Sequence, residues 1–63
     1  MGYIQIDTIR YDTNPQKAAK FTSTTVGSLI ERLSKYDKDM SVIVKGNAIG
    51  YTEYEIIGRI EQK

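Results

Sequence analysis

The stretch from Thr25 to Lys45 constrains the fold more than any other part of this chain, because it encodes a helix, a turn and a strand in direct succession. Thr25 is the expected N-cap, with Thr24 as a rival one residue earlier, since the Thr25 hydroxyl can accept a hydrogen bond from an amide two or three residues ahead. The apolar residues that follow stand at helical spacing and form one stripe: Val26, Leu29, Ile30 and Leu33. We expect this stripe to pack on one face of a sheet.

The end of this stretch predicts a turn and a buried strand. A polar turn over residues 36–39 ends the helix, and three consecutive β-branched residues, Val42 to Val44, follow it. Such a run is typical of a strand that is covered on both faces, and therefore central or at an interface. Gly27, in the first helical turn, is a poor helix former, and we expect it to mark the close approach of a neighbouring backbone.

The N-terminal part predicts one strand and a less certain partner for it. Ile4 and Ile6 alternate with polar residues, but the apolar parity then shifts, which indicates a β-bulge near Asp7 and Thr8 or a strand partly covered on both faces. The segment Asp12-Thr13-Asn14-Pro15 predicts a turn. Residues 17–22 then form either a short return strand or an irregular loop.

The C-terminal part predicts a hairpin loop over Gly46–Gly50 followed by a strand over Tyr51–Glu61. Strict alternation places Tyr54, Ile56, Gly58 and Ile60 on one face of that strand and Glu53, Glu55, Ile57 and Arg59 on the other. Gly58 in mid-strand indicates a bulge, a bend or close packing of another chain. The fold class is therefore α+β, in one domain (1–63): a small antiparallel sheet of three to four strands with one amphipathic helix on one face, β(β)αββ.

The size of the chain points to self-association. A domain of 63 residues buries only about 60% of the surface that its unfolded chain exposes. The chain has no Cys and no His, so neither a disulfide nor a zinc site of the usual Cys/His type can stabilise it. We expect a homo-oligomer, in which a second copy covers the sheet face that carries Tyr3, Gln5, Ile57 and parts of the Val42–Val44 run.

Charge and hydropathy exclude several classes. The net charge of +1 disfavours a dedicated duplex-DNA binder and a polybasic membrane anchor. No apolar run approaches the roughly 20 residues of a membrane span, and residues 1–10 do not have the pattern of a signal peptide. We therefore expect a cytoplasmic protein.

Catalytic signatures are missing, so we expect no enzyme, no cofactor and no metal. The commonest general base, His, and the Cys nucleophile are absent. Asp37 and Asp39 read as a solvated turn rather than a cation site. Glu53 and Glu55 read as an exposed strand face rather than an acid–base pair.

The loop after Lys45 is the best candidate for a ligand site. A cation, backbone amides freed by two glycines and an aromatic ring are the groups that a nucleotide-like ligand needs. The candidate residues are Lys45, Gly46, Asn47, Gly50, Tyr51, Tyr54 and Arg59. The alternative is a plain hairpin loop. Five tyrosines also suit an interface, with Tyr3, Tyr51 and Tyr54 as candidates.

The segment Thr25–Val44 resembles a pattern found in small, mostly uncharacterised proteins of phages and prophages: T-V-G-x-L-I-x-x-L, a short turn and a Val-rich strand. The acidic residue usual three positions after the cap Thr is Ser28 here, so we expect no full capping box. The resemblance implies a non-enzymatic anti-defence protein, a homo-oligomer that sequesters a small nucleotide-derived host ligand or blocks a host protein. It transfers no site residue.

Two other functions stay open. Arg10, Lys17, Lys20 and Arg59, together with tyrosines, could form a single-stranded nucleic-acid-binding module. The chain could also be a structural accessory subunit of a larger assembly, without a small ligand.

Overall fold

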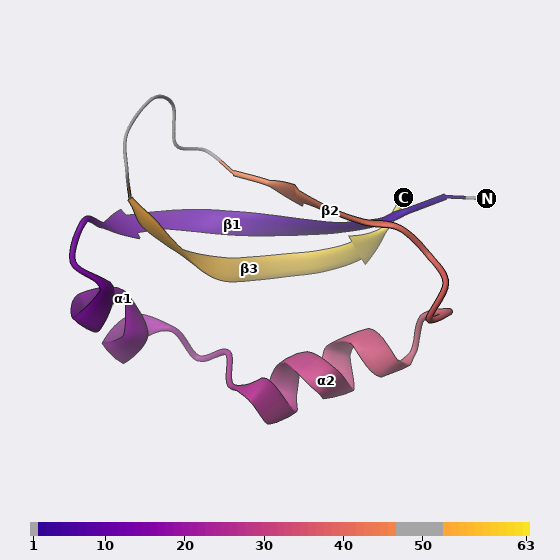
Figure 1. Ribbon diagram of the computed structural model, residues 1–63, viewed down its shortest axis with the longest axis horizontal. Coiled ribbons are helices and arrows are strands. Elements are labelled where there is room, and N and C mark those ends of the chain that lie inside the picture. The colour runs from indigo at the N-terminus through magenta and orange to yellow at the C-terminus, as the bar shows by residue number, and fades with distance from the viewer. Residues whose placement is uncertain (1, 47–52) are drawn as a thin grey trace.

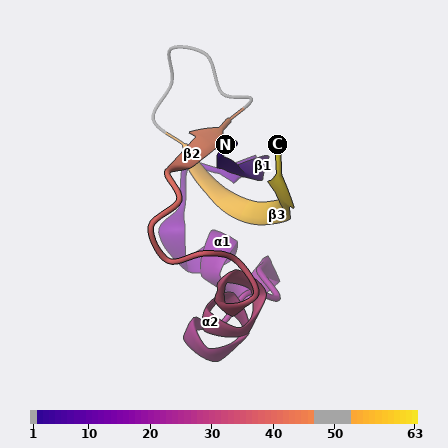
Figure 2. The ribbon, with the colours of Figure 1, turned by 90° about the vertical axis from the view of Figure 1, so that its right-hand side faces the viewer.

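The computed structural model describes residues 2–46 and 53–63 and shows a small α+β fold with a three-stranded mixed sheet and two helices. The elements are β1 (Ile4–Asp12), α1 (Pro15–Phe21), α2 (Val26–Ser34), β2 (Val42–Lys45) and β3 (Tyr54–Gln62). Both helices lie on the same side of the sheet (Figures 1 and 2). None of the described helices has the length and apolar character needed to cross a membrane.

The strand order is β2-β1-β3, with β1 parallel to β2 and antiparallel to β3. The prediction of an entirely antiparallel sheet is therefore wrong, and so is the predicted hairpin, because β1 lies between the two strands that the hairpin was to pair. The connection from β1 to β2 contains both helices. A crossover of this length carries the chain back to the end of the sheet where β1 begins, and this permits parallel pairing of β2 with β1.

A break in the β1–β3 pairing lies at the place predicted from the parity shift. The register shifts between Ile6 and Thr8, so that Gly58 and Arg59 of β3 lie opposite Asp7 alone. The irregularity near Asp7 is confirmed, but the extra residue belongs to β3 and not to β1.

This bulge changes which residues of β3 share a face. The partners of Ile57 and Ile60 lie two positions apart on β1, so these two side chains lie on the same face of the sheet. Ile56 lies on the other face. The predicted grouping of Ile56 with Ile60 is wrong, because it assumed an uninterrupted period of two. The register shift confirms the bulge predicted at Gly58, where a Cβ atom would lie 3.2 Å from the carbonyl oxygen of Asp7.

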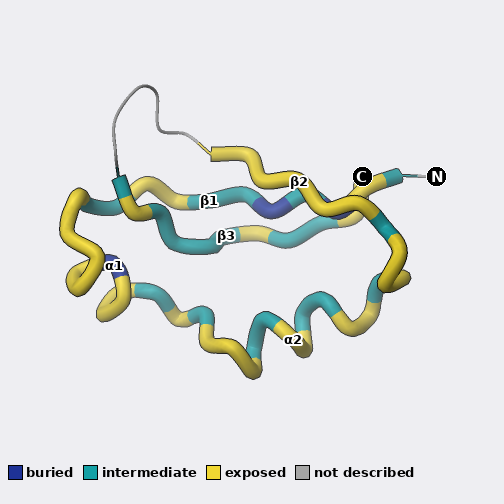
Figure 3. The backbone as a smooth tube through the Cα atoms, in the orientation of Figure 1, coloured by how far each residue is buried: buried dark blue, intermediate teal, exposed yellow. Residues whose placement is uncertain are grey.

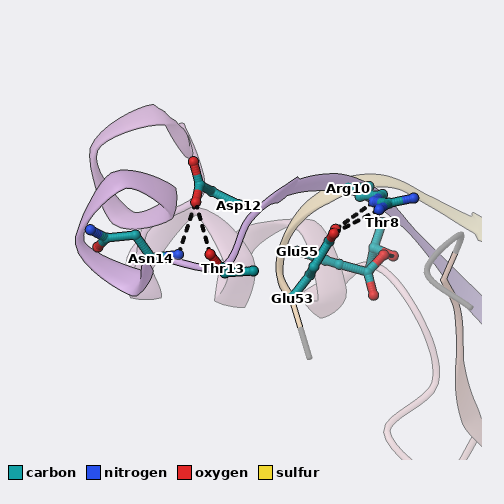
Figure 4. Close-up of polar contacts among 7 residues, drawn as sticks. All are labelled: Thr8, Arg10, Asp12, Thr13, Asn14, Glu53 and Glu55. Atoms are coloured by element: carbon teal, nitrogen blue, oxygen red, sulfur yellow. Dashed lines mark hydrogen bonds and ion pairs between the residues drawn. The ribbon is translucent and has the colours of Figure 1, made fainter. Parts of the chain in front are cut away.

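Residues 17–22 form neither a strand nor an irregular loop, since most of them belong to α1. Asn14 is the N-cap: its Oδ1 accepts hydrogen bonds from the amides of Gln16 (2.9 Å) and Lys17 (3.4 Å). Pro15 occupies the first helical turn, where its missing N–H costs no hydrogen bond. The carboxylate of Asp12 accepts a bond from the Asn14 amide (3.0 Å) and fixes the turn before the helix (Figure 4).

The start of α2 is confirmed at Thr25, whose hydroxyl accepts a bond from the Ser28 amide (3.1 Å). The expectation that Ser28 would leave the capping box incomplete is wrong. Ser28 Oγ accepts a bond from the Thr25 amide (2.9 Å), because a hydroxyl three residues after the cap reaches the same donor as a carboxylate. The turn after α2 is confirmed by the bond from the Asp39 amide to Asp37 Oδ1 (3.0 Å).

The core is very small. Within the described residues only Ile4, Ile6 and Ala18 are buried (Figure 3). The predicted packing of the whole α2 stripe on the sheet is wrong: Leu29 and Leu33 are half-buried, but 79% of Val26 and 63% of Ile30 are exposed. Nothing lies within 4 Å of a Cβ built on Gly27, so the expected close approach there is also wrong.

The Val42–Val44 run lies on an edge strand. These three residues are 45–64% exposed, so the prediction of a central, doubly covered strand is wrong for the single chain. The other half of that prediction, a strand at an interface, stays a prediction. Val42 and Val44 pair with Ile4 and Ile6 and share their face of the sheet, whereas Ile43 lies on the opposite face.

Candidate binding groove

A groove of about 400 Å³ opens between the helices and β3. Three parts of the chain line it: α1, the segment that leads into α2 together with its first turn, and the beginning of β3. Its volume lies within the range of about 300–1,000 Å³ that is usual for ligand sites. The lining residues are Pro15, Ala18, Ala19, Thr22, Thr24, Thr25, Val26, Leu29, Tyr54, Glu55, Ile56 and Ile57.

The α1 wall is fixed to the sheet by close packing. Ala18 is only 7% exposed, and its small side chain lets the helix lie close to β1 and β3. At the end of the helix the ring of Phe21 contacts the ring of Tyr11, with 5.1 Å between the ring centroids. This end of the groove is therefore the more firmly built one.

The α2 wall is attached more loosely. Leu29 faces the groove, and the guanidinium of Arg32 donates a hydrogen bond from Nη2 to the carbonyl oxygen of Gly58 (2.5 Å). No residue of α2 is buried. The groove thus has one wall held by packing and one wall held by a polar contact and two half-buried leucines.

The lining is mainly apolar, with threonine hydroxyls near the start of α2. Among the described residues of the lining Glu55 is the only charged one, and its Oε1 accepts a hydrogen bond from the Thr8 hydroxyl (2.8 Å). The described lining contains no lysine or arginine that could neutralise a phosphate. Its chemistry therefore suits an apolar segment better than an anion.

The structure places the predicted ligand residues in different surroundings. Asn47, Gly50 and Tyr51 lie outside the described residues. Lys45 ends β2, and Gly46 follows it beside Glu55: a Cβ on Gly46 would lie 3.0 and 3.3 Å from the two carboxylate oxygens. This negative charge disfavours an anionic ligand at that point of the backbone.

Tyr54 and Arg59 are the other two predicted ligand residues that the structure describes. Tyr54 is 46% exposed and lines the groove, so it is the member of the set that lies at the candidate site. Arg59 is one of the two residues of the bulge, and its Nη1 donates a hydrogen bond to Glu61 Oε1 (3.0 Å). This bond raises the pKa of Arg59 and, with help from Lys63, lowers the pKa of Glu61 against the opposing effect of desolvation.

Arg10 is also paired within the chain (Figure 4). Its guanidinium binds both carboxylate oxygens of Glu53, with 2.7 Å between Nη2 and Oε1, and this bond raises the pKa of Arg10. Two of the four cations considered for nucleic-acid binding, Arg10 and Arg59, thus already have carboxylate partners. The bidentate geometry ties the start of β3 to β1 instead.

The carboxylates considered for chemistry have structural contacts. Glu53 and Glu55 bind the side chains of β1, and the carboxylate of Asp37 closes its own turn. In residues 2–46 and 53–63, no group of three or more acidic residues is arranged to hold a metal ion.

The α1 side of the groove was missed from the sequence, because residues 17–22 were assigned to a strand or loop. The signal for the helix was present in Asn14 and Pro15, a favourable N-cap followed by a favourable first residue, and in the helix formers Ala18 and Ala19. Comparisons of the chain with protein-family models, curated proteins and solved structures give no match.

Proposed function

We propose that this chain is a non-enzymatic binding protein that works as a homo-oligomer and holds an apolar segment of another protein in the groove between α1, α2 and β3. The observation that carries the proposal is the composition of the groove. Apolar side chains and hydroxyls enclose a volume of about 400 Å³, with one carboxylate and no cation in the lining that the structure describes.

Between the two ligand classes raised by the sequence, these contacts favour a protein over a nucleotide. A nucleotide carries phosphates, and the described residues place Glu55 both in the groove lining and beside Gly46. An apolar side chain gains free energy on entering such a lining, because water leaves both surfaces. The resemblance to small phage proteins is compatible with both ligand classes, and the groove contacts favour the one in which the chain blocks a host protein in the host cytoplasm.

The test compares two neighbouring positions on α2. Leu29 lines the groove, whereas Ile30 is 63% exposed and does not line it. Immobilised wild type, Leu29→Glu and Ile30→Glu are each exposed to a bacterial host lysate, and the retained proteins are compared by mass spectrometry. We expect a specific protein on wild type and Ile30→Glu that Leu29→Glu does not retain.

Equal retention by all three proteins, or none by wild type, contradicts the proposed groove function. Circular dichroism of the two variants checks that α2 still forms. Light scattering of the wild type tests the homo-oligomer separately, and a monomer at micromolar concentration contradicts that part.

A further inference from the structure

We infer that β2 pairs antiparallel with β2 of a second copy across a two-fold axis, so that the two sheets become one continuous sheet. This inference rests on the proposed homo-oligomer and names the surface that forms it. It starts from the position of β2 at the edge of the sheet: among the described residues, β2 pairs with β1 only.

The backbone of β2 shows which groups are offered to a partner. The Ile4 amide donates to the carbonyl oxygen of Ser41 (2.9 Å), so the odd-numbered residues of β2 direct their N–H and C=O groups to β1. In a parallel ladder the intervening residues point the other way. The N–H and C=O groups of Val42 and Val44 therefore point to the free edge.

These groups select one register for an antiparallel pair. Residues that exchange both backbone hydrogen bonds must lie opposite each other, and the register that uses all groups of both copies pairs Val42 with the second copy's Val44. Ile43 then lies on the two-fold axis, opposite its own copy. Such a contact is self-complementary, as closed dimers require.

The side chains also fit this arrangement. Val42 and Val44 share a face with the buried Ile4 and Ile6, so pairing them across the axis extends the apolar row of the core. Ile43, which is 45% exposed, meets its own copy on the opposite face. None of these three residues is a charge or a proline, the devices that usually protect an exposed edge strand from pairing.

Charges at the two ends of β2 favour antiparallel over parallel pairing. Lys45 ends the strand, whereas the segment Asp37-Lys38-Asp39, with a net charge of −1, precedes it. An antiparallel partner brings the lysine end of one copy to the aspartate end of the other. A parallel partner would place like charges side by side.

The test uses the absence of cysteine from the chain. In the inferred register Ile43 faces its copy in a non-hydrogen-bonded pair, with about 4.5 Å between the Cα atoms. That separation lies within the range of about 4.4–6.8 Å that a disulfide spans. Ile43→Cys should therefore form a covalent dimer under mild oxidation, seen by non-reducing electrophoresis.

Two variants make the result specific. Val26→Cys places a thiol on α2 at a position that is 79% exposed but off the β2 edge, and should form no covalent dimer in the same experiment. Val44→Pro removes the amide that points to the partner and leaves the ladder to β1 intact. It should shift the wild-type oligomer towards the monomer in light scattering and abolish cross-linking in the Ile43→Cys background.

The outcomes separate this inference from the proposed function. An oligomeric wild type in which Ile43→Cys cross-links no faster than Val26→Cys overturns the β2 pairing and leaves the homo-oligomer standing. A monomeric wild type overturns both. Should Val44→Pro fail to fold, the comparison of the two cysteine variants decides the question alone.

Discussion

Single residues at the β1–β3 contact set the shape of the sheet. Gly58 sits at a bulge where only 3.2 Å separates the position of a Cβ from the Asp7 carbonyl oxygen. Towards one end of the sheet, the ion pair of Arg10 with Glu53 joins β1 to the start of β3. Towards the other end, the ion pair of Arg59 with Glu61 lies within β3. The close approach of the Asp7 backbone leaves no room for a side chain at Gly58. The residues of the ion pairs, in contrast, can be substituted without a steric clash.

Gly58→Ala should destabilise the protein, by about 1–3 kcal/mol, because backbone at this distance must move to admit a methyl group. Gly27→Ala is the control. Its methyl group meets nothing within 4 Å, and alanine favours the helix, so it should stabilise the protein by at most about 1 kcal/mol. Urea denaturation followed by circular dichroism measures both. A Gly58→Ala protein as stable as the wild type would show that β1 yields at the bulge.

Arg59→Gln should raise the pKa of Glu61, because the hydrogen bond from Arg59 is the main cause that lowers it. A carboxyl group with a lowered pKa in the folded protein stabilises the fold at neutral pH, and this contribution disappears as the pH falls through that pKa. A carbon-detected NMR titration of Glu61 measures the change. Arg10→Gln, at the other ion pair, should leave the Glu61 titration unaltered.

At the scale of elements, local signals predicted more than long-range ones. The cap at Thr25, the helix after it, the strand over Val42–Val44 and the irregularity near Asp7 all follow from neighbouring residues. The parallel pairing of β1 with β2 depends on how a distant crossover packs, and no residue encodes it. The short helix α1 is hard to predict, because its seven residues carry only a weak helical signal and directly follow a turn.

The candidate site was predicted less well than the fold, for a related reason. Of the predicted ligand residues that the structure describes, Tyr54 lines the groove, whereas Gly46 lies beside Glu55. A sequence shows which groups a loop offers, but the carboxylate that changes their electrostatics comes from another strand. The Ala18–Ala19 wall required α1 to be recognised first.

Helix α2 should be less protected from hydrogen exchange than β1, because α2 buries no residue whereas β1 buries Ile4 and Ile6. Amides of α2 should exchange with deuterium faster than those of β1. Thr25→Ala should lower the local stability of α2 by about 0.5–2 kcal/mol and leave β1 amides unchanged. Thr24→Ala, one residue earlier, is the control and should change neither. Equal losses in α2 and β1 would show that the helix and the sheet unfold together.

The whole molecule is too open for its length. A compact domain of 63 residues has a radius of gyration of about 11 Å, whereas this chain has 12.7 Å and measures 35 × 26 × 14 Å. Its described part buries only Ile4, Ile6 and Ala18. Apolar residues of the kind that normally supply a core instead lie at the surface, on α2 and β2. A molecule of this shape gains most by covering them with another chain.

Stability should therefore depend on concentration if the second copy supplies that cover. A tenfold rise in concentration stabilises a folded dimer by about 1.4 kcal/mol, which for a domain of this size corresponds to a few degrees in the unfolding midpoint. We expect the thermal midpoint of the wild type to rise with concentration and that of Val44→Pro to stay constant and lower. Scanning calorimetry at several concentrations measures both. A wild-type midpoint independent of concentration would mean that the single chain is the stable unit, although its described part buries only three residues.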